Sequence, residues 1–575
     1  MTKTVVVERD VMVPMRDGVR LATDIYRLDS AEPGPVLVHR NPYDKSVAQH
    51  VGSQMLNPIV AAEHGYTVVV QDCRGCFASE GVMDLYSQEF DDGYDCVEWA
   101  ATQPWSNGRV GIYGSSYMGV TALLAAVAAP PHLKAAASYL TTGNFHEGWM
   151  YTGGAFELGF NMGYTQVKAR QAIARRSIHA DRAAALMAEL GTSGANRLEL
   201  CRHLPLDEAP VLRERDVLPY WHDFLDHPTY DDYWRRLDVA GRADEIQAPI
   251  LHIAGWYDQF LKGHLDLNRA LDAHPNIHVR DTHRFVIGPW DHNSYEGHRL
   301  SAAGEREFGL AAISGVIAVS GLVLEWFDRW LCDVEGPMFA EPRVRYFSMA
   351  GPDQGWRTTP DWPPPTTPAP WYLGDRIGLT VERPTVPGAR SFDFDPNDPV
   401  PTVGGRTFSL AAGGGGVQDR AKVARRDDVL VFESAPLDKP ISVGGNVRAP
   451  LWVMSSAVDT DFTAHLVDVE PSGYCVPVAD GIQRARYRNS VEAPEFLTPD
   501  EPTELTIDLW DTAYTFAAGH RIRLEISSSS FPRWSRNANA AVQPEKARPD
   551  DLVVATNTVL FGPDQPSHLV LPTFG

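Results

Sequence analysis

The chain has few cysteines, and they are scattered. Six occur in 575 residues, at Cys73, Cys76, Cys96, Cys201, Cys332 and Cys475. So sparse a set excludes a disulfide-stapled scaffold, and we expect free thiols in a reducing cytoplasm. Cys73 and Cys76 have the C-x-x-C spacing, but no second pair of cysteines or histidines lies near them in the sequence. We therefore expect no metal site.

Positive charge is also scarce. Lys and Arg number 51 against 74 Asp and Glu, which gives a formal net charge of −23 at pH 7. An excess of negative charge repels nucleic acids and anionic membrane surfaces, so we expect neither as a partner. The same excess disfavours polyanionic substrates.

Long hydrophobic runs are missing. The most apolar stretch, residues 310–324, is interrupted by Ser and Gly and is shorter than the roughly 20 residues that a membrane-spanning helix needs. The first residues, MTKTVVVERD, contain no apolar segment of the length found in secretory signals. We therefore expect a cytoplasmic protein without a membrane span, with a buried helix at 310–324.

The chain is rich in the residues that build cores. Hydrophobic residues make up 44% of it, with 15 Trp, 20 Tyr and 22 Phe. A chain of this length is expected to form about two to four domains. The proline-rich stretch 359–370 marks a domain boundary.

Strand and helix patterns alternate before this boundary. Residues 4–26 alternate apolar and polar and turn at 16–18, which predicts two antiparallel strands. Apolar runs separated by helical patterns such as 89–101 predict a doubly wound, mostly parallel sheet, with strands at 36–39, 67–71, 109–113, 249–254 and 284–287. Within 138–240 the strand runs stop and segments such as 166–190 are typical of helices, which predicts a helical insertion.

After the boundary the pattern changes to short strands separated by Gly, Pro and Asp clusters. This pattern predicts an all-β jelly roll, with strands at 429–432, 451–454, 463–469, 505–509 and 522–526. The predicted organisation is a first core segment, a helical cap, a second core segment, and a linker with the jelly roll, at 1–137, 138–240, 241–350 and 351–575.

The segment 114–119, GSSYMG, follows a short apolar run and precedes an Ala/Leu-rich run. A serine between a strand and a helix, flanked by glycines, is typical of a strained elbow that exposes a nucleophilic hydroxyl. Ser116 is the candidate, because Gly114 precedes it by two residues. Ser115 is a poorer candidate, since Tyr113 stands where its leading glycine would be. The second glycine comes one place later than usual, and Met118 occupies the usual place.

A base and an acid follow Ser116 in the order that this fold class uses. Asp258 ends GWYD after the strand at 249–254, and His292 ends GPWDH after the strand at 284–287. Catalytic groups of open α/β sheets collect at such strand ends, where an acid orients the histidine that activates the serine. We prefer Asp258 over Asp291, because adjacent side chains rarely point at each other.

An oxyanion needs two hydrogen-bond donors. The backbone N–H of Tyr117, directly after the nucleophile, supplies one. The second is expected from the loop 40–44, RNPYD, which has no glycine run, so the Tyr43 hydroxyl is the candidate donor. A turn tyrosine with a solvated hydroxyl is the alternative.

These motifs resemble those of bacterial cocaine esterase-like hydrolases in the X-Pro dipeptidyl-peptidase (S15) superfamily. The resemblance covers nearly the whole chain, through the motifs MVPMRDGVRL at 12–21, RNPYDK at 40–45, GSSYMG at 114–119, GWYD at 255–258, GPWDH at 288–292, SSAVDTDFTAHLVD at 455–468 and GHR at 519–521, with a further match at 71–81. It implies an α/β-hydrolase domain with an inserted helical cap and a C-terminal jelly roll. It also implies a Ser116, Asp258 and His292 triad, with Tyr43 and Tyr117 at the oxyanion hole and no cofactor.

The resemblance further indicates the substrate class. Relatives that act on α-amino acid esters carry carboxylates that bind the substrate ammonium, but here those places hold Gln259, Phe260, Leu261 and Met118. Cocaine esterases line the acyl pocket with aromatic residues, and by position Trp149, Tyr164, Phe260 and Phe408 are the candidates here. Ordinary core or lid packing is the alternative for each of them.

We therefore expect a serine hydrolase that cleaves small carboxylic esters with an aromatic or bulky apolar acyl group. The alternatives are an amide-cleaving relative (an X-Pro dipeptidyl peptidase, or an acylase for β-lactams or α-amino acid esters), an acyltransferase, and a carbohydrate-binding protein built on 371–575. Whether the chain forms a homodimer stays open.

Overall fold

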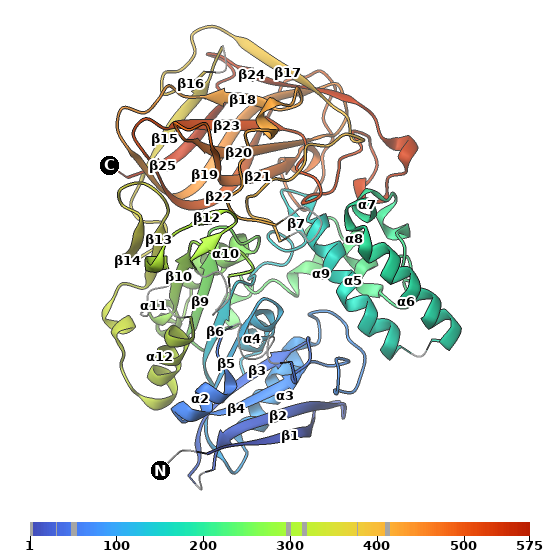
Figure 1. Ribbon diagram of the computed structural model, residues 1–575, viewed down its shortest axis with the longest axis vertical. Coiled ribbons are helices and arrows are strands. Elements are labelled where there is room, and N and C mark those ends of the chain that lie inside the picture. Colours follow the sequence, from blue (N-terminus) through green and yellow to red (C-terminus); the bar gives the residue numbers. More distant parts are fainter. Residues whose placement is uncertain are drawn as a thin grey trace.

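The computed structural model of the protein describes residues 4–29, 32–47, 55–176, 178–294, 301–312, 319–375, 378–408 and 414–574. Figure 1 shows an α/β domain at the N-terminal end, a β domain at the opposite end, and a group of helices that projects at the side. In the part of the chain that is described, no helix combines the length and apolarity needed to cross a bilayer.

The α/β domain is built on a ten-stranded sheet in the order β1-β2-β4-β3-β5-β6-β9-β10-β13-β14. β1 (Val5–Pro14) and β2 (Arg20–Leu28) form the predicted antiparallel hairpin at one edge. From β4 to β13 neighbouring strands pair in parallel, at β4 Thr67–Asp72, β3 Gly34–Asn41, β5 Ser106–Ser115, β6 Leu133–Tyr139, β9 Ile250–Gly255, β10 Arg284–Gly288 and β13 Val344–Ser348. Near-continuous apolar strands of this kind are expected where both faces of a sheet are covered.

Helices cover the sheet, at α2 Pro58–His64, α3 Glu89–Ala101, α4 Tyr117–Ala128, α10 Leu261–Asp272, α11 Ile277–Thr282 and α12 Val319–Cys332. α3 has the bounds that the sequence predicts, and its first turn carries Glu89, Asp91 and Asp92, which favour the positive end of the helix dipole. α4 is buried along nearly its whole length and carries no polar face. α12 covers only the last part of the predicted helix at 310–324, and residues 313–318 lie outside the described part.

The helical cap lies between β6 and β9 and begins with two short strands, β7 (Tyr151–Thr152) and β8 (Ala155–Phe156). The helices that follow are α5 Leu158–Arg175, α6 Ala180–Ala195, α7 Arg197–Arg202, α8 Pro219–Asp226 and α9 Asp232–Arg235. The helical segment expected at 166–190 is thus two helices. The first helix ends where Arg176 takes an extended conformation, and the second begins after His179, whose side chain accepts the Asp181 N–H as the N-cap of α6.

The β domain consists of a seven-stranded and a four-stranded antiparallel sheet, as expected for a jelly roll. The larger contains β15 Thr367–Leu373, β16 Leu379–Thr380, β17 Gly388–Phe394, β19 Ile441–Ser455, β22 Thr503–Phe516, β24 Ala555–Phe561 and β25 His568–Thr573. The smaller contains β18 Leu430–Glu433, β20 Asp461–Val469, β21 Cys475–Arg484 and β23 Arg521–Ser527. The inner faces share one hydrophobic core.

The α/β domain continues beyond residue 350, where the sequence places the end of its second core segment, and it gives way to the β domain within the proline-rich stretch 359–370. β14 (Gly355–Thr359) pairs antiparallel with β13, so the sheet of the α/β domain continues beyond residue 350. An edge strand of this kind forms because a partner strand is available, so its own short sequence does not show a clear strand pattern. The β domain begins with β15, on the far side of the prolines at 363–365.

Candidate active site

Ser116 lies between β5 and α4 in a backbone conformation that non-glycine residues rarely adopt, with φ 53° and ψ −125°. Two hydrogen bonds hold it there. Its N–H donates to the Tyr139 carbonyl at 2.9 Å, and its own carbonyl accepts the Thr141 hydroxyl at 2.7 Å. The strained turn therefore depends on β6 and on the loop that follows it.

The glycines on either side of Ser116 are required by close contacts. A Cβ at Gly114 would lie 2.2 Å from the Met118 carbonyl oxygen, and one at Gly119 would lie 2.8 Å from the Thr141 Cβ. Met118, at the usual place of the second glycine, is fully buried. The late glycine in GSSYMG is therefore the point where α4 approaches Thr141.

His292 lies between Ser116 and Asp258. Its Nε2 is 3.1 Å from the Ser116 Oγ, and its Nδ1 is 3.0 Å from Asp258 Oδ1. Both residues are buried, and Asp258 Oδ1 also accepts the Phe260 N–H at 3.3 Å. The loops after β9 and β10 thus bring together the three side chains that the sequence singles out.

The alternative residues lie elsewhere. The Asp291 carboxylate accepts the Asn293 N–H at 2.8 Å and the Ser294 hydroxyl. His283 lies at the opposite end of β10, 3.1 Å from Asp272. His252 is buried in β9 with its ring 4.4 Å from that of Phe285. Ser115 is buried at the end of β5.

Tyr43 and Tyr117 offer different hydrogen-bond donors: a side-chain hydroxyl from Tyr43 and a backbone N–H from Tyr117. The Tyr43 hydroxyl donates to the Tyr164 hydroxyl at 3.3 Å, and burial raises the pKa of Tyr43, which keeps the phenol protonated as a donor. Tyr117 is the first residue of α4, so its N–H has no acceptor within the helix. The Tyr117 hydroxyl points away from that N–H, donating to Glu89 Oε1 at 3.1 Å.

Behind the elbow is a buried charge network that the sequence did not reveal. The Arg40 guanidinium pairs with Glu89, and its Nε donates to Gln71 Oε1 at 3.0 Å. Glu89 in turn accepts the Tyr117 hydroxyl. The sequence offers Arg40 in the motif RNPYDK, shortly before Tyr43. Its partner Glu89 lies on α3, far along the chain, so the motif alone does not predict the pair.

Aromatic rings surround His292. The Phe260 ring centroid lies 4.8 Å from the imidazole and that of Phe408 lies 4.4 Å from it, while Trp149 stacks on Phe260 at 4.0 Å. Phe160, which is not among the aromatic residues proposed from the sequence, joins the set. It contacts Phe260 at 5.2 Å, Phe408 at 5.9 Å and Tyr164 at 5.6 Å. The i,i+4 spacing of Phe160 and Tyr164, which places both on one face of α5, is the sequence feature that could have indicated this position.

The β domain contributes Phe408 to this cluster through specific bonds. The Phe408 N–H donates to Gln259 Oε1 at 2.9 Å, and Arg406 donates to the Trp256 carbonyl at 3.0 Å. The Tyr257 hydroxyl donates to the Pro477 carbonyl at 3.2 Å. The loop that carries Asp258 is therefore held against the β domain.

The C-x-x-C pair is buried, and both thiols are free. Burial raises the pKa of Cys76 to about 11, so the thiol is protonated near neutral pH. Within the described ranges, no group of three or more His, Cys, Asp or Glu side chains is arranged to bind a metal ion.

Known proteins resemble this chain along its whole length. Residues 17–294 match the X-Pro dipeptidyl-peptidase (S15 family), and residues 338–570 match the X-Pro dipeptidyl-peptidase C-terminal non-catalytic domain. The cocaine esterase of Rhodococcus sp. (strain MB1 Bresler) is 37% identical over 578 residues, with 98% of each chain covered.

Two solved structures agree in fold. An α-amino acid ester hydrolase superimposes with a TM-score of 0.81 at 27% identity, covering 100% of this chain and 97% of that one. An aminopeptidase from the marine sediment archaeon Thaumarchaeota archaeon superimposes with a TM-score of 0.82 at 25% identity, covering 99% and 97%.

Proposed function

The chain belongs to the cocaine esterase-like hydrolases of the X-Pro dipeptidyl-peptidase (S15) family and is a serine carboxylic-ester hydrolase. On that premise we propose that it works through an acyl-enzyme on Ser116. One observation carries the proposal. The His292 imidazole lies between the Ser116 Oγ at 3.1 Å and the Asp258 Oδ1 at 3.0 Å. This is the arrangement in which a neutral imidazole accepts a serine proton.

The reaction then has two halves. Ser116 Oγ attacks the ester carbonyl as His292 Nε2 takes its proton, and the protonated imidazole gives that proton to the departing alkoxide. Water, deprotonated by the same nitrogen, next cleaves the acyl-enzyme and releases the acid. Asp258 accepts a hydrogen bond from the Nδ1–H of His292 throughout, and this bond holds the neutral imidazole in the tautomer whose Nε2 can take the serine proton.

The negative charge on the carbonyl oxygen is held by the Tyr117 N–H and the Tyr43 hydroxyl. Two features support this role: the open N–H at the start of α4 and the protonated, partly buried phenol of Tyr43. Donors aimed at developing charge act most strongly where water is excluded.

The acyl group is aromatic or bulky and apolar. The rings beside His292 support this choice, because Phe260 and Phe408 both lie within 4.8 Å of the imidazole and Trp149 and Phe160 extend the apolar wall. A flat acyl group can stack on such a surface.

Substrates with a free α-amino group are less well supported, although one structural relative is called an aminopeptidase and another an α-amino acid ester hydrolase. The carboxylates near the nucleophile already have partners: Asp258 pairs with His292 and Glu89 with Arg40. Gln259, at a place where such relatives carry an acid, is bound to the Phe408 N–H.

The proposal is tested by mass spectrometry of the intact protein mixed with 4-nitrophenyl benzoate. The expected result is a benzoyl adduct on the parent protein that maps to Ser116, with no adduct and no 4-nitrophenol burst in Ser116→Ala. Ser115→Ala is the matched control and should still form the adduct. An adduct on Ser116→Ala would contradict the assignment. A parallel assay with dipeptide amides separates ester from amide cleavage.

A further inference from the structure

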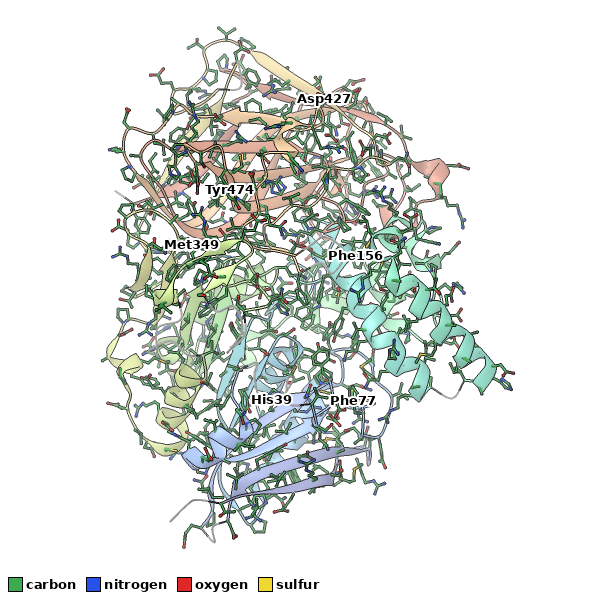
Figure 2. The ribbon with its side chains drawn as sticks, viewed as in Figure 1. His39, Phe77, Phe156, Met349, Asp427 and Tyr474 are labelled. Atoms are coloured by element: carbon green, nitrogen blue, oxygen red, sulfur yellow. The ribbon has the colours of Figure 1, made fainter. Side chains whose placement is uncertain are left out.

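A pocket of about 600 Å³ lies between the cap helix α5 and the loops after β3 and β4. Tyr43 lines it from the α/β domain, together with Phe77, and Lys168, Arg170 and Arg175 line it from α5. Figure 2 shows Phe77 on the side of the α/β domain that faces the cap helices. The pocket therefore shares Tyr43 with the candidate oxyanion hole.

The pocket contains cations without carboxylate partners. Lys168 is 1% exposed, and its ammonium donates to the Pro42 carbonyl at 2.8 Å and lies 4.2 Å above the Tyr43 ring. Its pKa is lowered by burial. As far as the chain is described, no Asp or Glu oxygen lies within 4.0 Å of the Lys168 nitrogen. A buried charge without a counter-charge is costly, so a partner supplied from outside would stabilise it.

The two arginines extend this positive surface. The Arg175 guanidinium donates to the Ser79 carbonyl at 2.9 Å, and among the described residues the Arg170 guanidinium has neither a hydrogen bond nor an ion pair. No acidic residue is among the described residues that line the pocket. This is unexpected in a chain of net charge −23.

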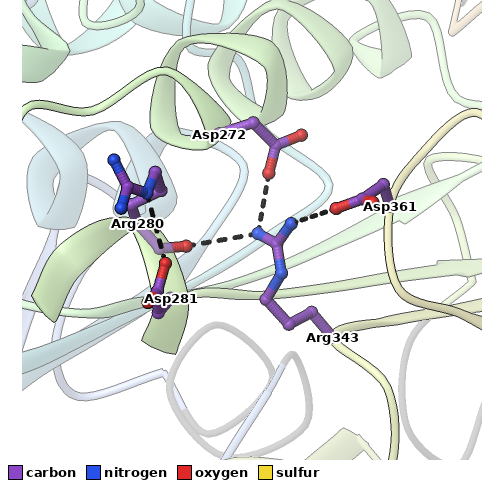
Figure 3. A pocket seen from close by; sticks show the side chains of 5 residues that line it. All are labelled: Asp272, Arg280, Asp281, Arg343 and Asp361. Atoms are coloured by element: carbon purple, nitrogen blue, oxygen red, sulfur yellow. Dashed lines mark hydrogen bonds and ion pairs between the residues drawn. The ribbon is translucent and has the colours of Figure 1, made fainter. Parts of the chain in front are cut away.

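A second pocket shows the arrangement that is ordinary for this protein. It has a volume of about 520 Å³ and is lined by Asp272, Arg280, Asp281, Arg343 and Asp361 (Figure 3). There Arg343 pairs with Asp272 at 2.7 Å and also with Asp361, and Arg280 pairs with Asp281. Each arginine of this pocket is paired with a carboxylate, whereas the cations of the α5 pocket are not.

The α5 pocket also offers apolar surface. Phe77 and Val167 line it and are 41% and 51% exposed. Large apolar side chains exposed beside unpaired cations fit a ligand that is mostly apolar and carries an anionic group.

We infer that this pocket binds the alcohol portion of an ester whose leaving group carries a carboxylate. The inference rests on the proposed function and refines its substrate class. The aromatic cluster at His292 takes the acyl group. Tyr43 links this cluster to the pocket, because its hydroxyl contacts Tyr164 and its ring contacts the Lys168 ammonium. The carboxylate then supplies the counter-charge that Lys168, Arg170 and Arg175 lack.

The test compares two esters of similar size that differ in charge, 4-carboxybenzyl benzoate and its primary amide, 4-carbamoylbenzyl benzoate. The methylene separates the carboxyl group from the reacting oxygen, so intrinsic reactivity is nearly equal. We expect the parent to prefer the carboxylate by about tenfold or more in kcat/KM, the effect of a charge-assisted hydrogen bond. Lys168→Met and Arg170→Gln should each lower that ratio.

Neighbouring arginines at the end of α5 provide the matched control. Arg175 lines the pocket, whereas Arg176 donates to the Asp216 carbonyl at 2.9 Å and is not among the lining residues. Arg175→Gln should lower the preference and Arg176→Gln should leave it unchanged. A parent without preference, or an equal loss in both variants, would overturn the inference.

Binding to the Ser116→Ala protein, measured by calorimetry, separates this inference from the proposed function. Tighter binding of the carboxylate ester than of the carbamoyl ester is expected there without any turnover. Equal binding contradicts the pocket assignment, even if the parent hydrolyses both esters. Failure of the parent to hydrolyse either ester contradicts the hydrolase mechanism instead.

Discussion

The ring of Phe408, which belongs to the β domain, lies 4.4 Å from the imidazole of His292 in the α/β domain. The backbone N–H of Phe408 is held by Gln259, the residue next to Asp258. The β domain therefore forms part of the wall around the reacting groups, and its removal would open the site to water.

We predict that Phe408→Ala lowers kcat/KM for a benzoyl ester by about three- to tenfold, the worth of one aromatic contact. Hydrolysis of the matching acetyl ester should change less, because an acetyl group has no ring to stack. Measuring kcat/KM for 4-nitrophenyl benzoate and 4-nitrophenyl acetate in parallel tests this difference. An equal loss on both esters would mean that Phe408 only supports the fold.

Tyr43→Phe should lower kcat about 10²- to 10³-fold with little change in KM, because the lost donor acts on the transition state. Tyr164→Phe is the control, since among the described residues the one hydrogen bond of its hydroxyl is that accepted from Tyr43 at 3.3 Å. We expect it to reduce kcat far less. A large loss in Tyr164→Phe with normal turnover in Tyr43→Phe would move the oxyanion role to Tyr164.

Stability should fall in mild acid. Burial lowers the pKa of His39 to about 4 and that of His264 to about 3, so each is neutral when folded and takes up a proton on unfolding. Their contribution to the free energy of unfolding is complete above the pKa of the unfolded chain, about 6.5. Below that pH the free energy of unfolding falls by about 1.4 kcal/mol per histidine for each pH unit, until the pKa of the folded state is reached. Protonation of His264 also removes the acceptor of the Thr141 N–H.

Urea unfolding at about pH 8 and about pH 5 measures this effect. His264→Gln should flatten the dependence, since an amide oxygen replaces the acceptor without titrating. His278→Gln, at an exposed position on α11, is the control. An unchanged slope in His264→Gln would contradict the assignment.

Gly119→Ala should destabilise the protein by about 1–3 kcal/mol, the cost of overpacking, and reduce turnover. The added methyl would lie 2.8 Å from both the Cβ and the Cγ2 of Thr141. Combination with Thr141→Ser removes the Cγ2 and keeps the hydroxyl that binds the Ser116 carbonyl. We expect partial recovery of both properties in the double variant, and purely additive losses would contradict a direct contact.

Much of the architecture was predictable because it is local. Strand runs, the helix at 89–101 and the hairpin at 4–26 follow from periodicity over a few residues. The candidate triad could be proposed because Ser116, Asp258 and His292 each follow a strand, and parallel strands bring their carboxyl ends to one edge. The structure brings these side chains within hydrogen-bond distance, and their catalytic roles remain the proposal.

Other features depend on partners that are distant in sequence. The Arg40–Glu89 pair, the place of Phe160 beside Phe408, and the pairing of β14 with β13 each join segments whose encounter no local pattern encodes. The lone ammonium of Lys168 is of the same kind, because α5 reads as an ordinary helix rich in basic residues.

The sequence by itself determined most of the elements, their order and the residue types at the strand ends, since those follow from local sterics and hydrophobic spacing. Only the tertiary structure decided which charges are buried, which are paired, and which rings surround His292. The physical reason is that burial and pairing are properties of the space between segments, and that space exists only after the chain has folded.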